Sequence, residues 1–342
     1  MRLVRAGARV RRGDMMRRSG LPLVSALLIL LATGCHVPGT SSGQAAGSQQ
    51  ITVADVPDFA NAPLQVAAKD GLFAENGVNV TVRTYQTLQQ AYAAVASGQA
   101  EVISGDYAGL LYMQAHAADD QLRLIADGYD ATPGLMEVLT LPGSAITAPQ
   151  DLEGQAVGTP PTELAPYSSD APYNSETLAT EAVLQSDGVS PPSVQWKVMA
   201  PSSMISALRD HTVSAIVTTQ PYILQAETEL GAVELLDACS GVTASLPLSG
   251  YFASAGFARG HAAALDGFRS ALSAATAGTA QLGTVRTVLR TLPGISSREA
   301  ALVTIGQYPT FLSVGQVQRV ADLMYGTGMI TNTVSVKNLV FP

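Results

Sequence analysis

Aromatic and hydrogen-bonding side chains recur in the short segments that directly follow predicted β-strands. The candidate binding residues are Phe59, Asn61, Asp106, Tyr107, Thr159, Asn174, Ser175, Thr219, Gln220 and Tyr222. Aromatic faces combined with a few amide, hydroxyl and carboxyl groups suit the noncovalent binding of a compact polar organic molecule. For Tyr107 and Tyr222, the alternative is packing inside a helix. For Asp106 and Ser175, the alternative is capping a helix N-terminus.

The same segments contain acids but no Lys or Arg. A cleft that carries acids and no cation favours a neutral or cationic ligand on electrostatic grounds. Helix N-termini and hydroxyl groups can also hold an oxyanion, so an oxyanion ligand is the second possibility. Three further acids, Asp58, Glu163 and Asp170, are expected to face solvent.

Groups that would support catalysis are missing from these segments. The four histidines are His36, His116, His211 and His261, and all lie outside the predicted binding loops. No Ser-His-Asp order, metal-ligand spacing or Gly-rich phosphate loop occurs. We therefore expect a binding protein rather than an enzyme, with no cofactor and no metal.

The elements that must position these loops alternate between strand and helix. In the first half, strands are expected at 51–55, 78–85, 100–104 and 122–126, and helices at 63–70, 88–96 and 108–117. In the second half, strands are expected at 155–158, 194–199, 214–218 and 233–239, and helices at 175–185, 204–209 and 222–230. This α/β alternation predicts parallel sheets with helices on both faces. Two such runs predict two similar lobes, with the ligand bound beyond the carboxyl ends of the strands.

Three stretches carry a resemblance to a known family. They are APLQVAAKDGLFAENG at 62–77, ASGQAE at 96–101 and TAPQDLEGQAVG at 147–158. Together they resemble the nitrate/sulfonate/taurine and thiamine-precursor (pyrimidine) group of ABC-transporter solute-binding proteins, over about 51–275. The sequence departs from the family pattern at Glu101, where aspartate is usual, at its counterpart Ser214, and at His211, where glycine is common. These are positions of the fold more than of the ligand site.

The resemblance implies a two-lobed periplasmic-binding-protein fold of type II-like topology. Each lobe would hold a mainly parallel sheet flanked by helices. Lobe one would comprise residues 51–137 with 252–342, and lobe two residues 138–251. The chain would cross between them at 136–139 and again at 250–253.

The function implied by the resemblance is that of a monomeric receptor that closes on a small organic solute and delivers it to an ABC permease and its ATPase. Two alternatives share the fold. One is the ligand-sensing module of a signalling system, and the other is an enzyme like the pyrimidine synthases.

The N-terminus reads as an export signal. Residues 1–20 contain seven arginines and one acid, and the apolar stretch at 21–33 is too short to span a bilayer. The sequence Ala32-Thr33-Gly34-Cys35 resembles a bacterial lipobox, so 1–34 is expected to be a lipoprotein signal peptide, Cys35 the lipidated residue and 35–50 a flexible tether. The alternative is a cleaved signal with an unmodified cysteine, and translation could also start at Met15 or Met16. The protein would then sit on the outer face of the cytoplasmic membrane in the bacterial cell envelope, held by its lipid anchor alone.

The net charge argues against nucleic acid and anionic lipid as partners, and the cysteine content argues against a disulfide. Removal of residues 1–34 takes away seven arginines and one aspartate, which changes the net charge from −8 to −14. Such a negative chain is unsuited to nucleic acid or to an anionic lipid surface. With Cys35 lipidated, Cys239 is the other cysteine, so no intramolecular disulfide is possible, and we expect Cys239 to be buried.

Overall fold

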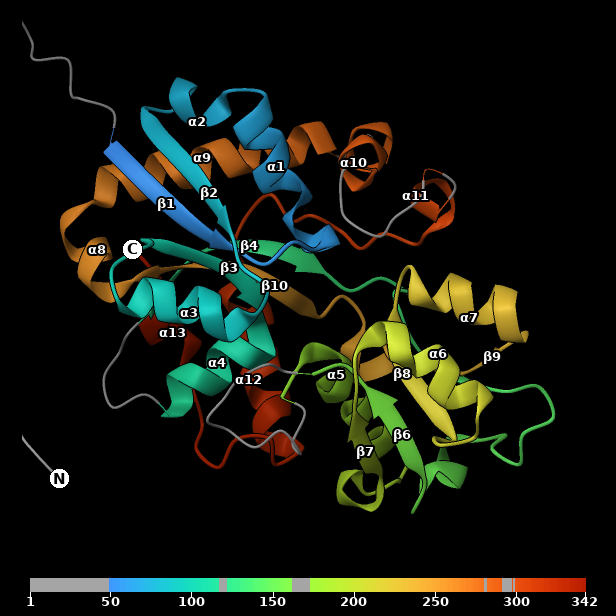
Figure 1. Cartoon of the computed structure of the whole chain (residues 1–342). Coiled ribbons are helices and arrows are strands. Elements are labelled where there is room, and N and C mark those ends of the chain that lie inside the picture. The colour runs from blue at the N-terminus through green and yellow to red at the C-terminus, as the bar shows by residue number, and fades with distance from the viewer. Residues whose placement is uncertain (1–48, 117–121, 162–172, 280–281, 291–296, 298) are drawn as a thin grey trace, which may run out of the picture. The chain divides into compact units, whose positions relative to one another are not determined.

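The computed structural model describes residues 49–116, 122–161, 173–279, 282–290, 297 and 299–342 (Figure 1). Cys35, the signal peptide and nearly all of the tether lie outside these residues, as do Glu163 and Asp170. No helix in the described part of the chain is long and apolar enough to cross a membrane.

The first lobe is built on a five-stranded sheet with the order β2-β1-β3-β10-β4. Its strands are β1 (Gln49–Asp55), β2 (Val78–Thr84), β3 (Val102–Asp106), β4 (Leu122–Asp130) and β10 (Pro247–Ser254). Strand β1 runs parallel to β2 and β3, and β10 runs antiparallel to both β3 and β4. The sheet is therefore mainly parallel, with β10 inserted in the opposite direction.

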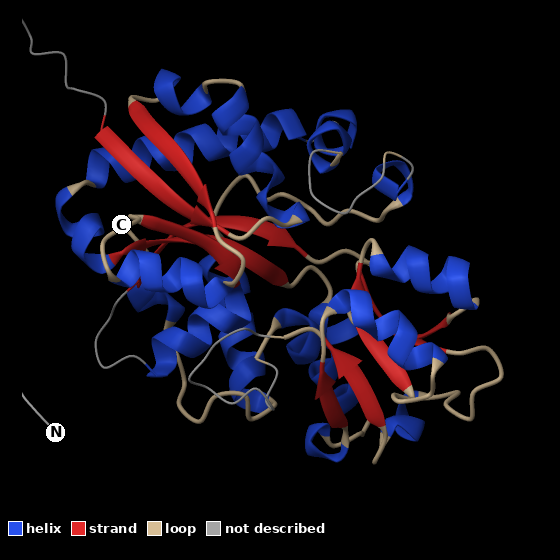
Figure 2. Cartoon of the chain, viewed as in Figure 1, coloured by secondary structure: helices blue, strands red, loops and turns tan. Residues whose placement is uncertain are grey.

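Helices cover both faces of this first sheet (Figure 2). Those from the N-terminal half are η1 (Phe59–Asn61), α1 (Ala62–Lys69), α2 (Leu72–Glu75), α3 (Leu88–Ala96) and α4 (Tyr107–His116). Those from the C-terminal part are α8 (Ala255–Gly260), α9 (Ala262–Thr279), α10 (Leu282–Leu289), α11 (Glu299–Leu302), α12 (Val314–Gly326) and α13 (Val336–Leu339). Helix α9 packs against α1 and α2, while α12 packs against α4. Segments from the two ends of the described chain thus complete one lobe.

The second lobe repeats the plan with a five-stranded sheet of order β7-β6-β8-β5-β9. Its strands are β5 (Met136–Thr140), β6 (Ala156–Thr159), β7 (Gln195–Val198), β8 (Ala215–Thr219) and β9 (Val233–Asp237). Its helices are η2 (Pro149–Leu152), α5 (Ser175–Ser186), η3 (Pro191–Ser193), α6 (Pro201–Arg209), α7 (Tyr222–Leu230) and η4 (Gly241–Thr243). Strand β5 runs antiparallel to β8 and β9, and β6 runs parallel to β7 and β8. The expected fold class, two α/β lobes with mainly parallel sheets, is confirmed.

Local sequence explains where several helices begin. The Thr87 side chain accepts a hydrogen bond from the backbone N of Gln90 and so caps α3. The Asn174 side chain accepts from the backbone N of Thr177 and caps α5 in the same way. Both caps satisfy an N–H group that has no partner within its helix.

The expected crossings at 136–139 and 250–253 are wrong, because both segments are strands. Residues 136–139 belong to β5 and residues 250–253 to β10, so the boundaries placed at 137/138 and 251/252 cut through strands. Both strands are buried along nearly their whole length because each lies between two neighbours of its sheet. The connections between the sheets are instead residues 131–135 and 238–246.

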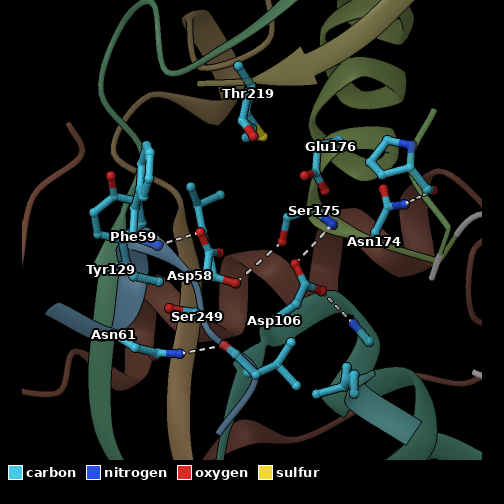
Figure 3. A pocket seen from close by; sticks show the side chains of 18 of the residues that line it. Asp58, Phe59, Asn61, Asp106, Tyr129, Asn174, Ser175, Glu176, Thr219 and Ser249 are labelled. Carbon is cyan, nitrogen blue, oxygen red and sulfur yellow. Dashed lines mark hydrogen bonds between the residues drawn. The ribbon is translucent and has the colours of Figure 1, made fainter. Parts of the chain in front are cut away.

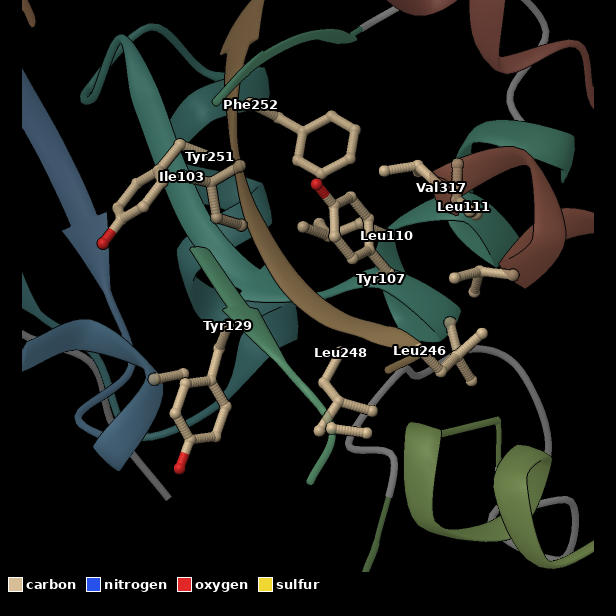
Figure 4. Packing of buried hydrophobic residues seen from close by; sticks show 14 of the residues in the cluster. Ile103, Tyr107, Leu110, Leu111, Tyr129, Leu246, Leu248, Tyr251, Phe252 and Val317 are labelled. Carbon is tan, nitrogen blue, oxygen red and sulfur yellow. The ribbon is translucent and has the colours of Figure 1, made fainter. Parts of the chain in front are cut away.

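The core of the first lobe is organised around a fully buried tyrosine (Figure 4). The ring of Tyr107 meets that of Phe252 edge to face, with 5.7 Å between centroids. Its hydroxyl donates a hydrogen bond to Asp127 Oδ1 at 3.1 Å. Gly250 leaves room for this ring, since a Cβ there would lie 2.5 Å from Tyr107 Cζ. Glycine at this position is therefore required by a close approach.

Candidate functional site

A pocket of about 240 Å³ opens between loops that belong to both lobes (Figure 3). Its apolar lining is Val56, Phe59, Ala60, Leu88, Gly105, Gly109, Leu135, Met136, Pro160, Pro161 and Leu248. Its polar lining is Asp58, Asn61, Asp106, Tyr129, Tyr173, Asn174, Ser175, Glu176, Thr219, Gln220 and Ser249. Ligand pockets commonly measure about 300–1,000 Å³, so this one suits a compact molecule.

Seven of the ten predicted binding residues line this pocket. They are Phe59, Asn61, Asp106, Asn174, Ser175, Thr219 and Gln220. The other three are absent from the lining. Tyr107 points into the core of the first lobe, and Thr159 is fully buried with its hydroxyl 3.0 Å from that of Thr177. Tyr222 packs against the smaller hydrophobic cluster of the second lobe. Both tyrosines therefore have the packing contacts that the alternative interpretation expects.

Asp106 joins the two sides of the pocket. Its Oδ1 accepts a hydrogen bond from the backbone N of Gly109 in α4 at 2.7 Å. Its Oδ2 accepts from the backbone N of Ser175 in α5 at 3.1 Å. Burial raises the pKa of Asp106 to about 6, although hydrogen bonds from Ser175 and Gly109 act in the opposite direction. One carboxylate thus caps a helix of each lobe.

Asn174 and Ser175 bring the start of α5 to the pocket. Asn174 caps the helix and also donates from Nδ2 to the carbonyl of Pro160 at 2.9 Å. The Ser175 hydroxyl donates to the carbonyl of Leu248, on β10 of the first sheet, at 3.4 Å. This pair therefore positions α5 as well as lining the pocket.

Asp58 corrects an expectation, because it lines the pocket instead of only facing bulk solvent. Its Oδ1 accepts a hydrogen bond from the backbone N of Phe59 at 2.5 Å and caps η1. The residue as a whole is exposed, but its carboxyl group lies in the pocket, where burial raises its pKa. The signal for this role was its place after β1, in the same loop as Phe59.

Phe59 and Asn61 are held by a buried polar network beneath the pocket. Asn61 Nδ2 donates to Asp55 Oδ1 at 2.7 Å and to the carbonyl of Val56 at 2.9 Å. The Ser104 hydroxyl donates to the same Asp55 oxygen at 2.8 Å. Burial raises the pKa of Asp55 to about 6. The amide of Asn61 is thereby committed to shaping the loop that carries Phe59.

Two aromatic residues of the pocket were not predicted. Tyr129 lies near Phe59 in Figure 3, and its hydroxyl accepts a hydrogen bond from the backbone N of Gly306 at 2.6 Å. Tyr173 stacks on Tyr112 with 3.9 Å between ring centroids. Strand β4 was expected to end at residue 126, but it continues to Asp130 and so includes Tyr129.

Glu176 was also missed, although it directly follows Ser175. It lies in the first turn of α5 and lines the pocket (Figure 3). Burial, followed by the nearby Asp106 carboxylate, raises the pKa of Glu176 to about 8, and Asp58 acts in the same direction. The favourable effect of a helix N-terminus on an acid, about 0.3–1 kcal/mol, is too small to reverse this.

Three carboxyl groups determine the electrostatic character of the pocket. Asp58, Asp106 and Glu176 all line it, while none of its described lining residues is Lys, Arg or His. The sequence of 162–172 adds no cationic residue either. The charge available to a ligand is therefore negative, apart from the partial positive charge of the helix N-termini.

The described residues offer no site for a metal, since no group of three His, Cys, Asp or Glu side chains is placed to hold one. Cys239 is fully buried, as expected, and burial raises the pKa of its thiol to about 12. It is outside the pocket lining.

The chain is similar to several solved structures of this architecture. The periplasmic aliphatic sulphonate binding protein SsuA from Escherichia coli is 18% identical with a TM-score of 0.66, covering 86% of this chain and 97% of that one. The alkanesulfonate-binding protein SsuA from Xanthomonas axonopodis pv. citri, bound to MOPS, is 18% identical with a TM-score of 0.65, covering 86% and 99%. The desulfurization enzyme DSZB is 15% identical with a TM-score of 0.63, covering 86% of this chain and 96% of that one. At these identities, the likeness establishes a shared periplasmic-binding-protein fold.

Sequence comparison supplies the family. No curated protein sequence matches the chain significantly. A family model described as NMT1/THI5 like matches residues 58–281, which is well over half of the chain and includes the loops that line the pocket in both lobes. The resemblance carried by the three sequence stretches is thereby confirmed, and the protein belongs to the NMT1/THI5-like family.

Proposed function

We propose that the protein is an extracytoplasmic receptor that binds a small organic solute in this pocket and delivers it to an ABC importer. The observation that carries the proposal is the pocket itself, whose lining comes from the strand ends and helix starts of both lobes. The lobes are joined through residues 131–135 and 238–246, and such paired connections permit hinge closure around a ligand. The SsuA structures, which are sulfonate-binding proteins of the same fold, support a binding role.

The solute that fits this lining best is neutral or cationic. An ionised Asp106 carboxylate without a described cation repels an anion, whereas amide, hydroxyl and aromatic groups accept a polar organic molecule. An oxyanion is the alternative, favoured by the helix N-termini at the pocket and by the sulfonates that the SsuA proteins bind.

The location proposed for the receptor rests on its N-terminal sequence. A lipid on Cys35 and a Gly/Ser/Gln-rich tether would hold the folded unit on the outer face of the cytoplasmic membrane, beside a permease and its ATPase. In this role the receptor would act as a monomer, with the lipid as its contact with the membrane.

The similarity to DSZB makes an enzyme the alternative from another class. An enzyme like the pyrimidine synthases would need reactive Cys and His groups at the pocket, and none of the described lining residues is either. A signalling module would use the same pocket as a transport receptor. Solute uptake by cells that lack the gene separates these two, because only a transport receptor would restore uptake when supplied in trans.

A thermal-shift screen of the purified protein tests the binding role. The panel contains nitrate, taurine, alkanesulfonates, thiamine pyrimidines, riboflavin and polyamines. A ligand at about 100 times its dissociation constant stabilises the folded state by about 2.7 kcal/mol. We expect such a shift with a neutral or cationic compound, and the absence of a shift with every compound would contradict the receptor role.

A matched pair of variants ties that shift to the pocket. Phe59→Leu removes an aromatic face that lines the pocket, so we expect it to reduce the ligand-induced shift. Tyr222→Phe alters a predicted binding residue that lies outside the lining, so the shift should stay as in the wild type. The opposite pattern would place the ligand elsewhere.

A further inference from the structure

Asp106 occupies an unusual position among the acids of the pocket, because both of its carboxylate oxygens accept hydrogen bonds from helix starts. Oδ1 accepts from the backbone N of Gly109 in α4, and Oδ2 accepts from the backbone N of Ser175 in α5. Figure 3 shows the Asp106 carboxylate beside Ser175. Helix α4 follows β3 of the first sheet, whereas α5 follows β6 of the second.

These helix starts are the groups of the pocket most able to attract an anion. The first N–H groups of a helix have no partner within it, and the helix dipole adds partial positive charge at that end. Helix α4 has 10 residues and α5 has 12, so both dipoles are developed. Since no Lys, Arg or His is among the described lining residues, an oxyanion solute would depend on N–H groups at helix starts, such as these two, for its attraction.

We propose that Asp106 is the residue that determines the charge of the solute: its carboxylate takes the place of an oxyanion and thereby excludes sulfonates, nitrate and similar anions from the pocket. The proposal rests on the receptor function proposed above. The internal anion accepts one N–H group from each helix start, so an oxyanion bound at these groups would have to displace a covalently tethered competitor. It would also come close to a second and a third carboxyl group, those of Asp58 and Glu176.

The same geometry explains why a neutral or cationic solute is accepted. Such a solute leaves the two hydrogen bonds of Asp106 in place and can contact the other two carboxyl groups of the lining, Asp58 and Glu176. Asp106 then keeps α4 and α5 together with their starts facing one another. The residue acts as a selectivity element, and it also ties the two lobes.

Two substitutions separate this role from a general effect of charge. Asp106→Ser removes the carboxylate, leaves space for an anionic group and frees the backbone N–H of Ser175 at the start of α5, while the shorter serine side chain can still cap α4. Asp58→Asn removes one negative charge from the same pocket, but Asp58 caps the three-residue η1 through the N of Phe59 and leaves the starts of α4 and α5 occupied. Asp106→Asn is a second test variant of nearly unchanged size.

The experiment measures the affinity of ethanesulfonate and nitrate by titration calorimetry for the full chain purified in detergent, as wild type and as these three variants. Circular dichroism melts show which variants are folded. We expect no measurable binding of either anion to the wild type or to Asp58→Asn. We expect ethanesulfonate to bind Asp106→Ser at least about tenfold more tightly than the wild type, because a repelling carboxylate is gone and the start of α5 is free to bind the anion.

Three results would overturn the proposal: ethanesulfonate binding to the wild type as tightly as to Asp106→Ser, an equal gain in Asp58→Asn, or no gain in either folded Asp106 variant. The compound panel of the thermal-shift screen, run on the same wild-type protein, distinguishes this failure from a failure of the receptor function. If a neutral or cationic compound binds while the Asp106 variants gain no anion binding, only the selectivity role is wrong. If no compound of the panel binds, the receptor function itself fails.

Discussion

Replacing Glu176 with Gln should make the protein more stable in alkaline solution and leave its stability in acid unchanged. The pKa of Glu176 is raised to about 8 because the pocket shields most of the carboxyl group from water and because the Asp106 and Asp58 carboxylates lie near it. Between about pH 4.5 and 8 the folded chain therefore keeps a proton on this residue that the unfolded chain has released. Under this linkage, the free energy of unfolding falls as the pH rises through that range. Glutamine does not titrate, so the free energy of unfolding of the variant does not fall through this cause as the pH rises.

The size of the effect follows from the two pKa values. The difference between 4.5 and about 8 corresponds to about 5 kcal/mol at 1.36 kcal/mol per pH unit, as an upper limit. The side chain is partly open to solvent, and screening lowers the expected gain to about 1–2 kcal/mol above pH 8. For a chain of this length, that gain raises the melting temperature by about 2–6 °C.

Thermal unfolding followed by circular dichroism at pH 4.5 and pH 8.5 measures this difference. Glu153→Gln is the control, because Glu153 is an exposed acid outside the pocket lining and should respond equally little at both pH values. The reasoning is refuted if Glu176→Gln is no more stable than the wild type at pH 8.5. It is refuted equally by a gain of the same size at both pH values.

Three further changes test the core and the anchor. Gly250→Ala brings a Cβ to 2.5 Å from Tyr107 Cζ and should cost about 1–3 kcal/mol in urea unfolding; unchanged stability would contradict the close packing. Tyr107→Phe removes the hydrogen-bond donor to Asp127 and should lower the free energy of unfolding by about 1 kcal/mol without changing solute affinity in calorimetry. Weakened solute binding would show that Tyr107 takes part in the binding site. Cys35→Ser should release the protein from membranes into the medium, because a lipid on this cysteine would supply most of the membrane affinity; fractionation identical to wild type would exclude lipidation.

The sequence by itself determined the order and type of most elements, because these depend on local patterns. Helices α3 and α7 match their predicted bounds residue for residue, since each has a periodic apolar face and α3 also has a capping threonine. Strand β2 differs from its prediction by one residue. The alternation of these elements was enough to predict two lobes and to place the binding loops at the strand ends.

Strands β5 and β10 were decided by tertiary structure. Both were predicted to be extended connections between the lobes. Their own residues do not indicate which strands will lie beside them in a sheet. Strand β10 pairs with β3 and β4, which precede it by more than a hundred residues. An extended apolar segment becomes an inner strand only when two such partners are present to satisfy its backbone groups.

Within the binding site, too, the sequence predicted some features and tertiary packing decided others. Strand ends predicted which loops would line the pocket, but not which side chain of a loop points into it. Asp106 and Tyr107 are adjacent, yet the turn from β3 into α4 directs the carboxylate toward the pocket and the phenol into the core. Glu176 and Tyr129 reach the pocket through the phase of α5 and the length of β4, both of which are set by packing against distant elements.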